Sequence, residues 1–343
     1  MKSIKDIQNL KGVKVLLRLD LNVPNDFRIR KALPTLKYLC ENGAKTIIIS
    51  HIDKTLEPVA EYLNKFFKVI FVKNYCNILT ELEKINDGEM ILLENIRNWQ
   101  EEKNNDPRFA KELASLADIY INDAFSVCHR EHASIVGIPK YLPSYAGFQL
   151  EEEIKYLSKC FNPSRPFIFI LGGAKFDTKI PLIKKFLNIA DYIFVGGALA
   201  NNFLKEKGMD IGTSRVSTED FNLKEYLNNP KLILPIDFER KNNSIVDAGP
   251  KTVKELKKYI NKSKFVLWNG PLGEYENGFK KPTLELAKII AESDTQSVVG
   301  GGDTLAAISE LGLEDKFTFV STGGGAMIQY LADGTLPGIE ALG

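Results

Sequence analysis

Residues 297–326 read SVVGGGDTLAAISELGLEDKFTFVSTGGGA, in which two short β-rich runs each end in three consecutive glycines. Glycines at strand ends let the backbone approach a ligand closely and point its N–H groups outward. A helix that begins there adds the positive end of its dipole. One triplet could be an ordinary turn, whereas two triplets indicate a nucleotide. The stretch therefore predicts a site that binds nucleotide phosphates.

Short runs rich in Val, Ile, Leu and Phe recur along the chain and are typical of buried parallel strands. The first series comprises residues 13–19, 46–50, 69–72, 90–93 and 119–121, and the second comprises 167–171, 192–195, 232–234, 265–268, 297–299 and 317–320. Stretches with helical spacing, such as 31–42 and 108–117, separate these runs. This alternation predicts an α/β fold with two doubly wound, Rossmann-like parallel-sheet domains. An amphipathic stretch, GFQLEEEIKYLSKC at 147–160, predicts a hinge helix between them.

The composition fits an ordinary globular protein, with 44% hydrophobic and 26% charged residues among 343. A net charge of +1 gives no electrostatic reason to bind nucleic acid or an anionic membrane. The four cysteines are scattered, which is typical of reduced thiols in a cytoplasmic protein. No apolar stretch approaches the length of a membrane span. We expect a soluble, cytoplasmic protein.

Open parallel sheets bind ligands beyond the carboxyl ends of their strands. In the first half, these ends carry or adjoin Asp20, Asn22, Arg28, His51, Lys54, Arg97, His129, Arg130 and His132. Arginine grips phosphate or carboxylate oxygens in bidentate fashion, and the Asp and Asn side chains suit hydroxyl groups. We predict a site for a small phosphorylated or carboxylated substrate. The alternative is that these residues cap helices or pair with Asp123 and Glu131.

The second half carries glycine and lysine at its strand ends. Gly172 and Gly173 follow an apolar run, and Lys175 and Lys179 stand four residues apart, on one face of a helix that begins there. Two such lysines repel each other unless an anion lies between them, which favours a phosphate site. The alternative is that both are solvated surface lysines.

Two acidic residues of the second half also admit two readings. Asp303 is either a helix N-cap or a ligand that reaches Mg²⁺ on a nucleotide. Glu276 either accepts ribose hydroxyls or is an ordinary exposed glutamate. The chain has no GxxxxGK[ST] loop, no GxGxxG in its first βα unit, and no HRD or DFG signature, so the common nucleotide-binding designs are excluded.

An ordered series of motifs resembles one family, the phosphoglycerate kinases. The motifs are RLDLNVP, LLENIR, INDAFSVCHREHAS, AGF, LGGAKFDTKI, IGTS, DAGPKTV, WNGPLG, GGGDT, STGGGA and LPGIEAL. The resemblance runs through nearly the whole chain in the family's order. It implies a phosphotransferase with a carboxyl acceptor, which transfers a phosphoryl group reversibly between 1,3-bisphosphoglycerate and Mg-ADP in glycolysis and gluconeogenesis. The products are 3-phosphoglycerate and Mg-ATP.

The resemblance also implies roles for the residues that match the family's motifs. The implied 3-phosphoglycerate site contains Asp20, Asn22, Arg28, His51, Arg97 and Arg130. The implied nucleotide site contains Lys175, Lys179, Gly197, Asn269, Glu276, Gly302, Asp303 and Thr304, with Asp303 nearest the metal. The implied catalytic residues are Arg28, Lys175 and Gly325.

A domain organisation and a mechanism follow from the resemblance. We expect a monomer with a 3-phosphoglycerate domain at residues 1–148, on which 332–343 packs back, and a nucleotide domain at 149–331. Phosphoryl transfer needs positioning and charge stabilisation rather than a protein nucleophile. We therefore expect in-line transfer after hinge closure, with no covalent intermediate.

The chain departs from the family pattern in three places. Lys54 stands where the family has an arginine, Ala198 where many members have a third glycine, and residues 214–263 are compressed.

Two rival hypotheses belong to other classes. One is a catalytically silent nucleotide-binding protein, which would be favoured by loss of Arg28, Lys175 or Asp303, and all three are present. The other is a purely structural role for the glycines and basic residues.

Overall fold

Two six-stranded parallel sheets organise the chain, one in each of two units. The computed structural model describes residues 1–22, 26–219 and 221–343. The first unit comprises Met1–Lys155 and Thr335–Gly343, and the second comprises Tyr156–Gly334. The predicted α/β class with two parallel sheets is confirmed.

The first sheet has the strand order β3-β4-β2-β1-β5-β6. Its strands are β1 (Lys14–Leu19), β2 (Lys45–Ile49), β3 (Val69–Val72), β4 (Met90–Leu93), β5 (Ile119–Asp123) and β6 (Ser144–Ala146). β1 pairs in parallel with β2 on one side and with β5 on the other. The chain thus reverses its direction of winding between β1 and β5, which is where a doubly wound sheet binds its ligand.

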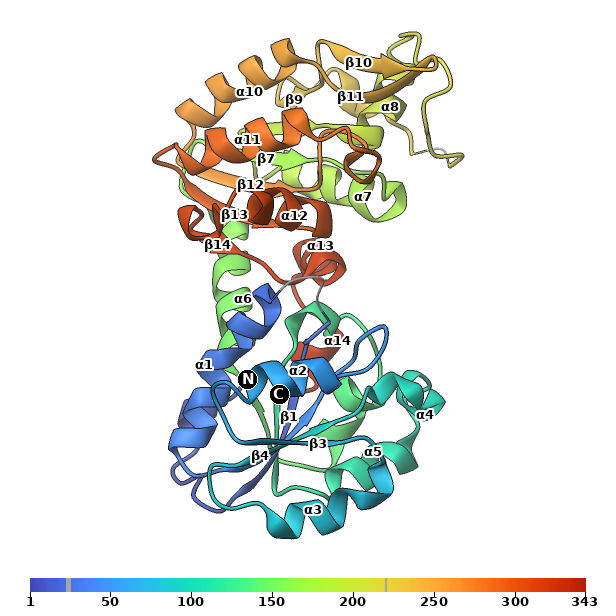
Figure 1. Cartoon of the computed structure of the whole chain (residues 1–343). Helices are drawn as coiled ribbons and strands as arrows, with labels where there is room; N and C mark the ends of the chain where they lie inside the picture. The colour runs from blue at the N-terminus through green and yellow to red at the C-terminus, as the bar shows by residue number, and fades with distance from the viewer. Residues whose placement is uncertain (23–25, 220) are drawn as a thin grey trace. The chain divides into compact units, whose positions relative to one another are not determined.

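Helices surround this sheet, as Figure 1 shows for α1, α3 and α5 around β1, β3 and β4. The α-helices of this unit are α1 (Phe27–Glu41), α2 (Glu57–Leu63), α3 (Ile78–Lys84), α4 (Gln100–Lys103), α5 (Pro107–Ala114) and α14 (Pro337–Glu340). Asp106 caps α5 by accepting from the backbone N–H groups of Arg108 and Phe109, and Pro107 occupies the first helical position. Leu36 and Leu39 of α1 are fully buried.

The second sheet has the order β14-β13-β12-β7-β8-β9. Its strands are β7 (Phe167–Leu171), β8 (Tyr192–Val195), β9 (Leu232–Ile233), β12 (Phe265–Asn269), β13 (Gln296–Gly300) and β14 (Phe319–Val320). Every residue of β7 and β12 is buried, as expected for central strands covered on both faces. The winding reverses between these two strands.

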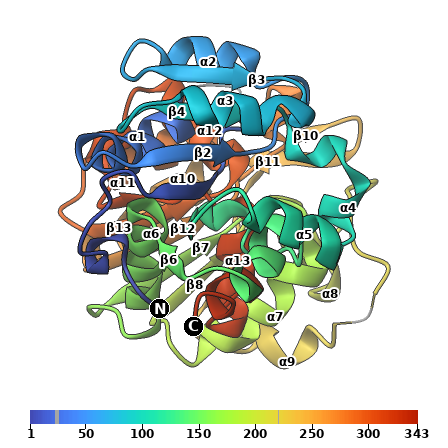
Figure 2. The same ribbon diagram turned by 90° about the horizontal axis from the view of Figure 1, so that it is seen from below.

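The helices of the second unit cover both faces of its sheet. They are α7 (Phe176–Leu187), α8 (Gly197–Glu206), α9 (Lys224–Leu227), α10 (Pro250–Lys262), α11 (Lys281–Ala291), α12 (Gly302–Glu310) and α13 (Gly324–Asp333). Figure 2 shows α10 and α11 on one side of β7 and β12, and α7 and α8 on the other. No helix in the described part of the chain is long and apolar enough to cross a membrane.

Helix α6 (Phe148–Ser158) lies within the stretch predicted to be a hinge helix, and the boundary between the units falls inside it. Its N-terminus is fixed by side chains of the first unit. Asp123 Oδ1 accepts from Leu150 N at 2.9 Å, and Thr35 Oγ1 accepts from Phe148 N at 3.1 Å. At the other end of the chain, Gly338 N of α14 donates to Cys128 O at 2.8 Å.

Two features of the fold have no counterpart in the predicted elements. β6 is a three-residue edge strand, Ser144–Ala146, too short to form an apolar run. β10 (Phe238–Lys241) and β11 (Ser244–Ala248) form an antiparallel hairpin. Asn242 and Asn243 form its turn with φ of 48° and 63°, the left-handed values that a tight hairpin needs.

Candidate active site

The first unit gathers charged side chains where its sheet reverses direction, beyond the carboxyl end of β1. Arg28 Nη1 lies 2.8 Å from Asp20 Oδ2 and also donates to Asn22 O at 2.8 Å. His51 Nε2 lies 4.0 Å from Asp20 Oδ1. The structure therefore brings together the carboxylate, one arginine and one histidine of the set predicted for a substrate site.

Arg18 belongs to this cluster but was missed by the sequence analysis. Its side chain is fully buried, it donates from Nε to Ser134 Oγ at 2.9 Å, and its Nη2 donates to His51 Nδ1 at 3.2 Å. Burial and the positive charge of Arg18 hold the pKa of His51 far below its ordinary value, so His51 is neutral. The signal was present in the sequence, because an arginine interrupts the apolar strand VLLRL.

Arg97 brings unsatisfied hydrogen-bond donors to the cluster. Its Nε and Nη2 atoms are buried and have no hydrogen-bond partner among the described residues. Burial, with repulsion from Arg18 and Arg130, lowers the pKa of Arg97 to about 10. Burial and repulsion from Arg97 likewise lower the pKa of His132 to about 4. An anion bound here would both accept these hydrogen bonds and relieve the repulsion.

The remaining predicted residues of the first unit lie nearer to solvent. Arg130 and Lys54 are exposed, and Asn22 is partly buried. Asn22 N donates to Asp20 Oδ1 at 3.0 Å, which links this loop to the buried carboxylate. The sequence analysis also considered Asp123 as a pairing partner for these basic residues. In the structure, Asp123 accepts the hydrogen bond from Leu150 N at the start of α6 that is described above.

In the second unit, glycine backbone brings the loops that follow β7, β8 and β12 close together. A Cβ atom on Gly172 would lie 2.1 Å from Pro271 O, and one on Gly197 would lie 2.5 Å from Gly173 N. Gly197 also has φ of +62°, which disfavours other residues. The sequence folds this way because only glycine fits between the facing loops. The result is a glycine cradle, formed by Gly172, Gly173, Gly197 and Gly270.

The two predicted lysines lie at this cradle but differ in environment. Lys175 is the exposed N-cap residue of α7, whereas Lys179 is buried inside the first turns of that helix. Lys179 Nζ donates to Gly172 O. Burial, followed by repulsion from Lys175, lowers the pKa of Lys179 to about 8. A nearby anion would stabilise its charged form.

Both glycine triplets begin helices, as their sequence predicts. α12 begins at Gly302 and α13 at Gly324, so Gly302 and Gly325 lie in first turns. Asp303 is not the N-cap of α12, because Gly301 occupies that position with φ of +110°. Burial and repulsion from Glu276 raise the pKa of Asp303, and the two lysines oppose this shift.

Two further predicted residues also make contacts that support the local structure. Thr304 is fully buried, and its Oγ1 accepts from Gly270 N at 2.9 Å. Asn269 is buried at the end of β12, with Nδ2 3.7 Å from Met327 Sδ. Both contacts fix the loop that follows β12, and so they help to shape the glycine cradle. Glu276 is exposed.

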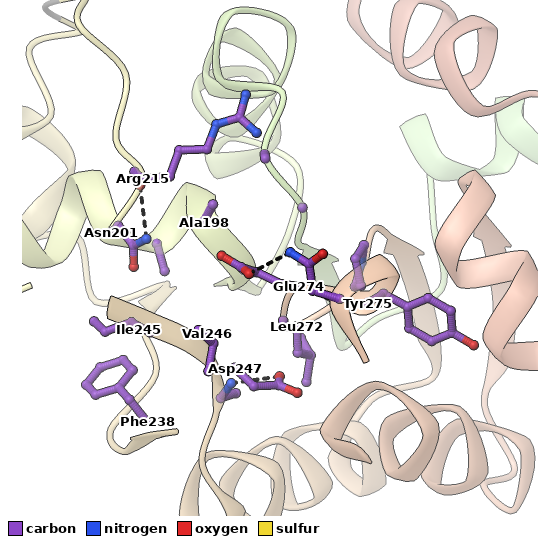
Figure 3. A pocket seen from close by; sticks show the side chains of 18 of the residues that line it. Ala198, Asn201, Arg215, Phe238, Ile245, Val246, Asp247, Leu272, Glu274 and Tyr275 are labelled. Atoms are coloured by element: carbon purple, nitrogen blue, oxygen red, sulfur yellow. Dashed lines mark hydrogen bonds between the residues drawn. The ribbon is translucent and has the colours of Figure 1, made fainter. Parts of the chain in front are cut away.

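A cavity of about 230 Å³ opens beside the cradle within the second unit. Gly173, Gly197 and Asp303 form part of its wall, and Glu276 lines it as well. Figure 3 shows other lining side chains, including Ala198, Phe238, Ile245, Val246 and Leu272. The cavity thus joins an apolar slot to a polar end with glycine backbone and a carboxylate. This combination suits a nucleotide, with its base in the slot.

Comparisons with known proteins cover nearly the whole chain. The family model "Phosphoglycerate kinase" matches residues 4–334. The chain belongs to the phosphoglycerate kinase family. This confirms the predicted family and the predicted enzyme class, a phosphotransferase that acts as a kinase in glycolysis.

Individual relatives support the same assignment. The phosphoglycerate kinase of Dictyoglomus turgidum is 42% identical, with 99% of this chain and 98% of the relative covered. That of Clostridium botulinum strain Hall is 40% identical, with 99% and 98% covered. The solved phosphoglycerate kinase of Pyrococcus horikoshii superposes with a TM-score of 0.86 at 31% identity, covering 100% of this chain and 98% of that one. That of Coxiella burnetii gives 0.83 at 34%, covering 99% and 98%.

The chain is shorter than the Dictyoglomus relative. Its alignment with the Dictyoglomus relative spans 390 positions, more than the 343 residues of this chain. Segments of the relative are therefore absent here. Residues 214–263, which the sequence analysis identified as compressed, follow α8 and include the hairpin β10–β11 that lines part of the cavity.

Proposed function

We propose that this protein transfers a phosphoryl group in line between 1,3-bisphosphoglycerate and Mg-ADP, after closure about a hinge and without a covalent intermediate. One observation carries the proposal: each sheet has, where its winding reverses, a cluster of residues suited to bind an anion, and the two clusters differ in chemistry. The reaction needs a phosphoryl donor and a phosphoryl acceptor, and these are two chemically different anions. Family membership over residues 4–334 supports this reaction.

In this proposal, residues 1–148 bind 3-phosphoglycerate, 332–343 pack back on them, and 149–331 bind the nucleotide. The substrate contacts are Asp20, Asn22, Arg28, His51, Arg97 and Arg130. The unpartnered donors of Arg97 favour an anion there, and Asp20 and Asn22 suit the substrate's hydroxyl. Because His51 is neutral, its role is to donate or accept a hydrogen bond rather than to carry charge.

The nucleotide contacts are Lys175, Lys179, Gly197, Asn269, Glu276, Gly302, Asp303 and Thr304. Mg²⁺ prefers oxygen ligands and is usually held by one or two carboxylates together with substrate phosphates. Asp303 fits that donor set, because it is a half-buried carboxylate near two lysines that also attract phosphate. Asp303 would hold the ion, which neutralises phosphate charge when the nucleotide is bound.

The chain's own part in the mechanism is positioning and charge stabilisation. We assign Arg28, Lys175 and Gly325 to the oxygens of the transferring phosphoryl group, the first two by charge and the third through the start of α13. Removal of one such charged contact costs on the order of 3 kcal/mol of transition-state stabilisation.

The substrates bind to different units in this proposal, so they meet by closure about a hinge in residues 147–160. We further propose that the enzyme is monomeric and cytoplasmic.

Trapping of the acyl phosphate with hydroxylamine tests the function. Wild-type protein with Mg-ATP and 3-phosphoglycerate is expected to give the hydroxamate, and Lys175→Ala to lose about 100-fold of that rate. Lys184→Ala is the matched control, because Lys184 is an exposed lysine elsewhere on α7. Absence of hydroxamate from the wild type, with Mg-ADP still raising its melting temperature, would instead support a silent nucleotide-binding protein.

A further inference from the structure

A buried carboxylate, Glu94, stands at the carboxyl end of β4, the end that faces the substrate cluster. It directly follows Leu93, the last residue of the strand, and is 7% exposed. Arg97, in the same motif LLENIR, belongs to the proposed substrate site, whereas Glu94 lies outside it. A buried carboxylate costs free energy unless hydrogen-bond donors compensate it, so its partners indicate what it holds in place.

Three donors among the described residues satisfy this carboxylate, and two of them come from the segment that leads into α2. Thr55 Oγ1 donates to Glu94 Oε2 at 2.6 Å, and Leu56 N donates to Glu94 Oε1 at 2.9 Å. The third donor is Asn95 N, at 2.7 Å from Oε1. Burial acts to raise the pKa of Glu94, but these hydrogen bonds outweigh it and lower the pKa. The group is therefore ionised at neutral pH.

Asn95 holds the other end of the same segment. Its Nδ2 donates to Ile52 O, and its Oδ1 accepts from Arg97 N at 3.1 Å. Loop 52–55 is thus held at its start by Asn95 and at its end by Glu94. The two residues that anchor the loop also lead directly into the segment that carries Arg97.

Lys54 lies within this anchored loop and has no commitment elsewhere. It is exposed, and it forms no hydrogen bond or ion pair with any residue that the structure describes. An exposed lysine on a free loop would turn away from neighbouring arginines, because it would otherwise lose side-chain freedom and gain repulsion. A loop held at both ends keeps the Lys54 backbone beside the segment of Arg97. A bound anion then has to order only the lysine side chain.

We propose that Glu94 is a positioning residue for 3-phosphoglycerate, which holds loop 52–55 so that Lys54 makes a further cationic contact with the bound substrate. This inference rests on the proposed function and adds to it a residue that acts through another. Loss of Glu94 releases the loop and removes the contribution of Lys54 to substrate binding, but it does not alter the groups around the transferring phosphoryl group. In the hydroxamate assay, Glu94→Ala therefore raises KM for 3-phosphoglycerate and leaves kcat near the wild-type value.

A double-mutant cycle on calorimetric affinity for 3-phosphoglycerate tests the proposal. Lys54→Met and Glu94→Ala are each expected to weaken binding about tenfold. Because Glu94 acts through Lys54, the double variant should lose about the same factor, whereas independent roles would give about 100-fold. Glu94→Gln should bind nearly as well as the wild type, since its amide oxygen can accept from both backbone N–H groups and its NH₂ group can donate to Thr55 Oγ1. Affinity for Mg-ADP should stay unchanged in all of them.

Glu89→Ala is the matched control, because Glu89 directly precedes β4 at the opposite end of the strand. It accepts from Lys68 Nζ at 2.6 Å and from Asn86 N at 3.0 Å. This variant should bind 3-phosphoglycerate with wild-type affinity. Thr55→Val is a milder second variant, which removes one anchor of the loop and leaves the backbone donors of the carboxylate in place. Its smaller loss of affinity should disappear in the Lys54→Met background.

Additive losses in the cycle, wild-type affinity in Glu94→Ala, or failure of Glu94→Gln to retain affinity would overturn the proposal. If Glu94→Ala fails to fold, the cycle with Thr55→Val decides the matter in the same way. Additive losses in a protein that forms the hydroxamate would overturn this inference alone. Coupled losses in a protein that binds 3-phosphoglycerate but forms no hydroxamate would overturn the proposed reaction alone.

Discussion

The two clusters that we propose to bind anions differ in composition. The cluster of the first unit consists of polar side chains close to one another, with the fully buried Arg18, the neutral and buried His51 and the half-buried Arg97 at its centre. The cluster of the second unit consists of glycine backbone with one buried lysine, Lys179. The first stores electrostatic repulsion that a ligand relieves, and the second depends on the absence of side chains. The first should therefore be weakened by removal of a group, and the second by addition of one.

The largest effect is expected from adding a single methyl group to the glycine cradle. In Gly172→Ala, the new Cβ would meet Pro271 O at 2.1 Å and the backbone around Gly270 as well, neither of which can rotate away. We expect a loss of about 3 kcal/mol in the free energy of unfolding, together with loss of Mg-ADP binding. Chemical denaturation measures the first quantity and calorimetry the second.

Gly302→Ala is the control for stability, since a Cβ there meets no atom within 4 Å. It should unfold at the same denaturant concentration as the wild type or slightly higher, because alanine favours helices. If Gly172→Ala lost less than about 1 kcal/mol, the close-packed description of the cradle would be wrong.

A smaller effect is expected from removing a charge in the first unit. Arg97→Met deletes two buried donors that lack a partner and one source of repulsion toward Arg18 and Arg130. The ligand-free protein should melt at an equal or higher temperature, whereas affinity for 3-phosphoglycerate should fall by about 2 kcal/mol. Arg108→Met, at an exposed arginine of α5, should change neither quantity. A lower melting temperature with unchanged affinity would mean that Arg97 is structural.

The smallest effect is a pH dependence at Lys179, whose pKa is lowered to about 8. A bound phosphate favours the charged ammonium and so raises this pKa, which means that Mg-ADP affinity should fall as pH rises through 8, by up to about tenfold per unit. Stability has the opposite sign. Between pH 8 and the ordinary lysine pKa of 10.5, the unfolded chain binds the proton that the folded protein has lost, so this residue's contribution to stability rises with pH.

Lys179→Arg keeps its charge throughout this range and should remove the fall in affinity above pH 8. Calorimetry in buffers of different ionisation enthalpy should also detect proton uptake on binding by the wild type and none by the variant. An identical pH profile for the two proteins would show that another group titrates.

Much of this fold could be predicted because its central strands are both buried and apolar. FIFIL at β7 and the runs that follow it satisfy the rule for a parallel sheet without any knowledge of tertiary contacts. β6 has only SYA, and its place beside β5 follows from contacts distant in sequence, so no local pattern could reveal it. The hairpin β10–β11 did carry a local signal, the asparagine pair at its turn, which went unused.

The site shows the same division between local and distant information. The glycine triplets and the lysines after FIFIL are contiguous motifs, whose helix starts the structure reproduces. The buried Asn201 Oδ1 and Asp247 Oδ2 have no hydrogen-bond partner among the described residues, and they lie on α8 and β11, two elements that only the tertiary structure brings to one cavity. A sequence shows which residue stands at such a position, but not whether its polar atoms find hydrogen-bond partners.

The most direct test of the account is a crossed calorimetric titration of 3-phosphoglycerate and Mg-ADP into the wild type, Arg97→Met and Lys179→Met. The account predicts that each substitution weakens the binding of one ligand only. Arg97→Met should lose affinity for 3-phosphoglycerate and keep that for Mg-ADP, and Lys179→Met should do the reverse. Loss of both ligands in either variant, or loss of the wrong one, would contradict the assignment of one substrate to each cluster.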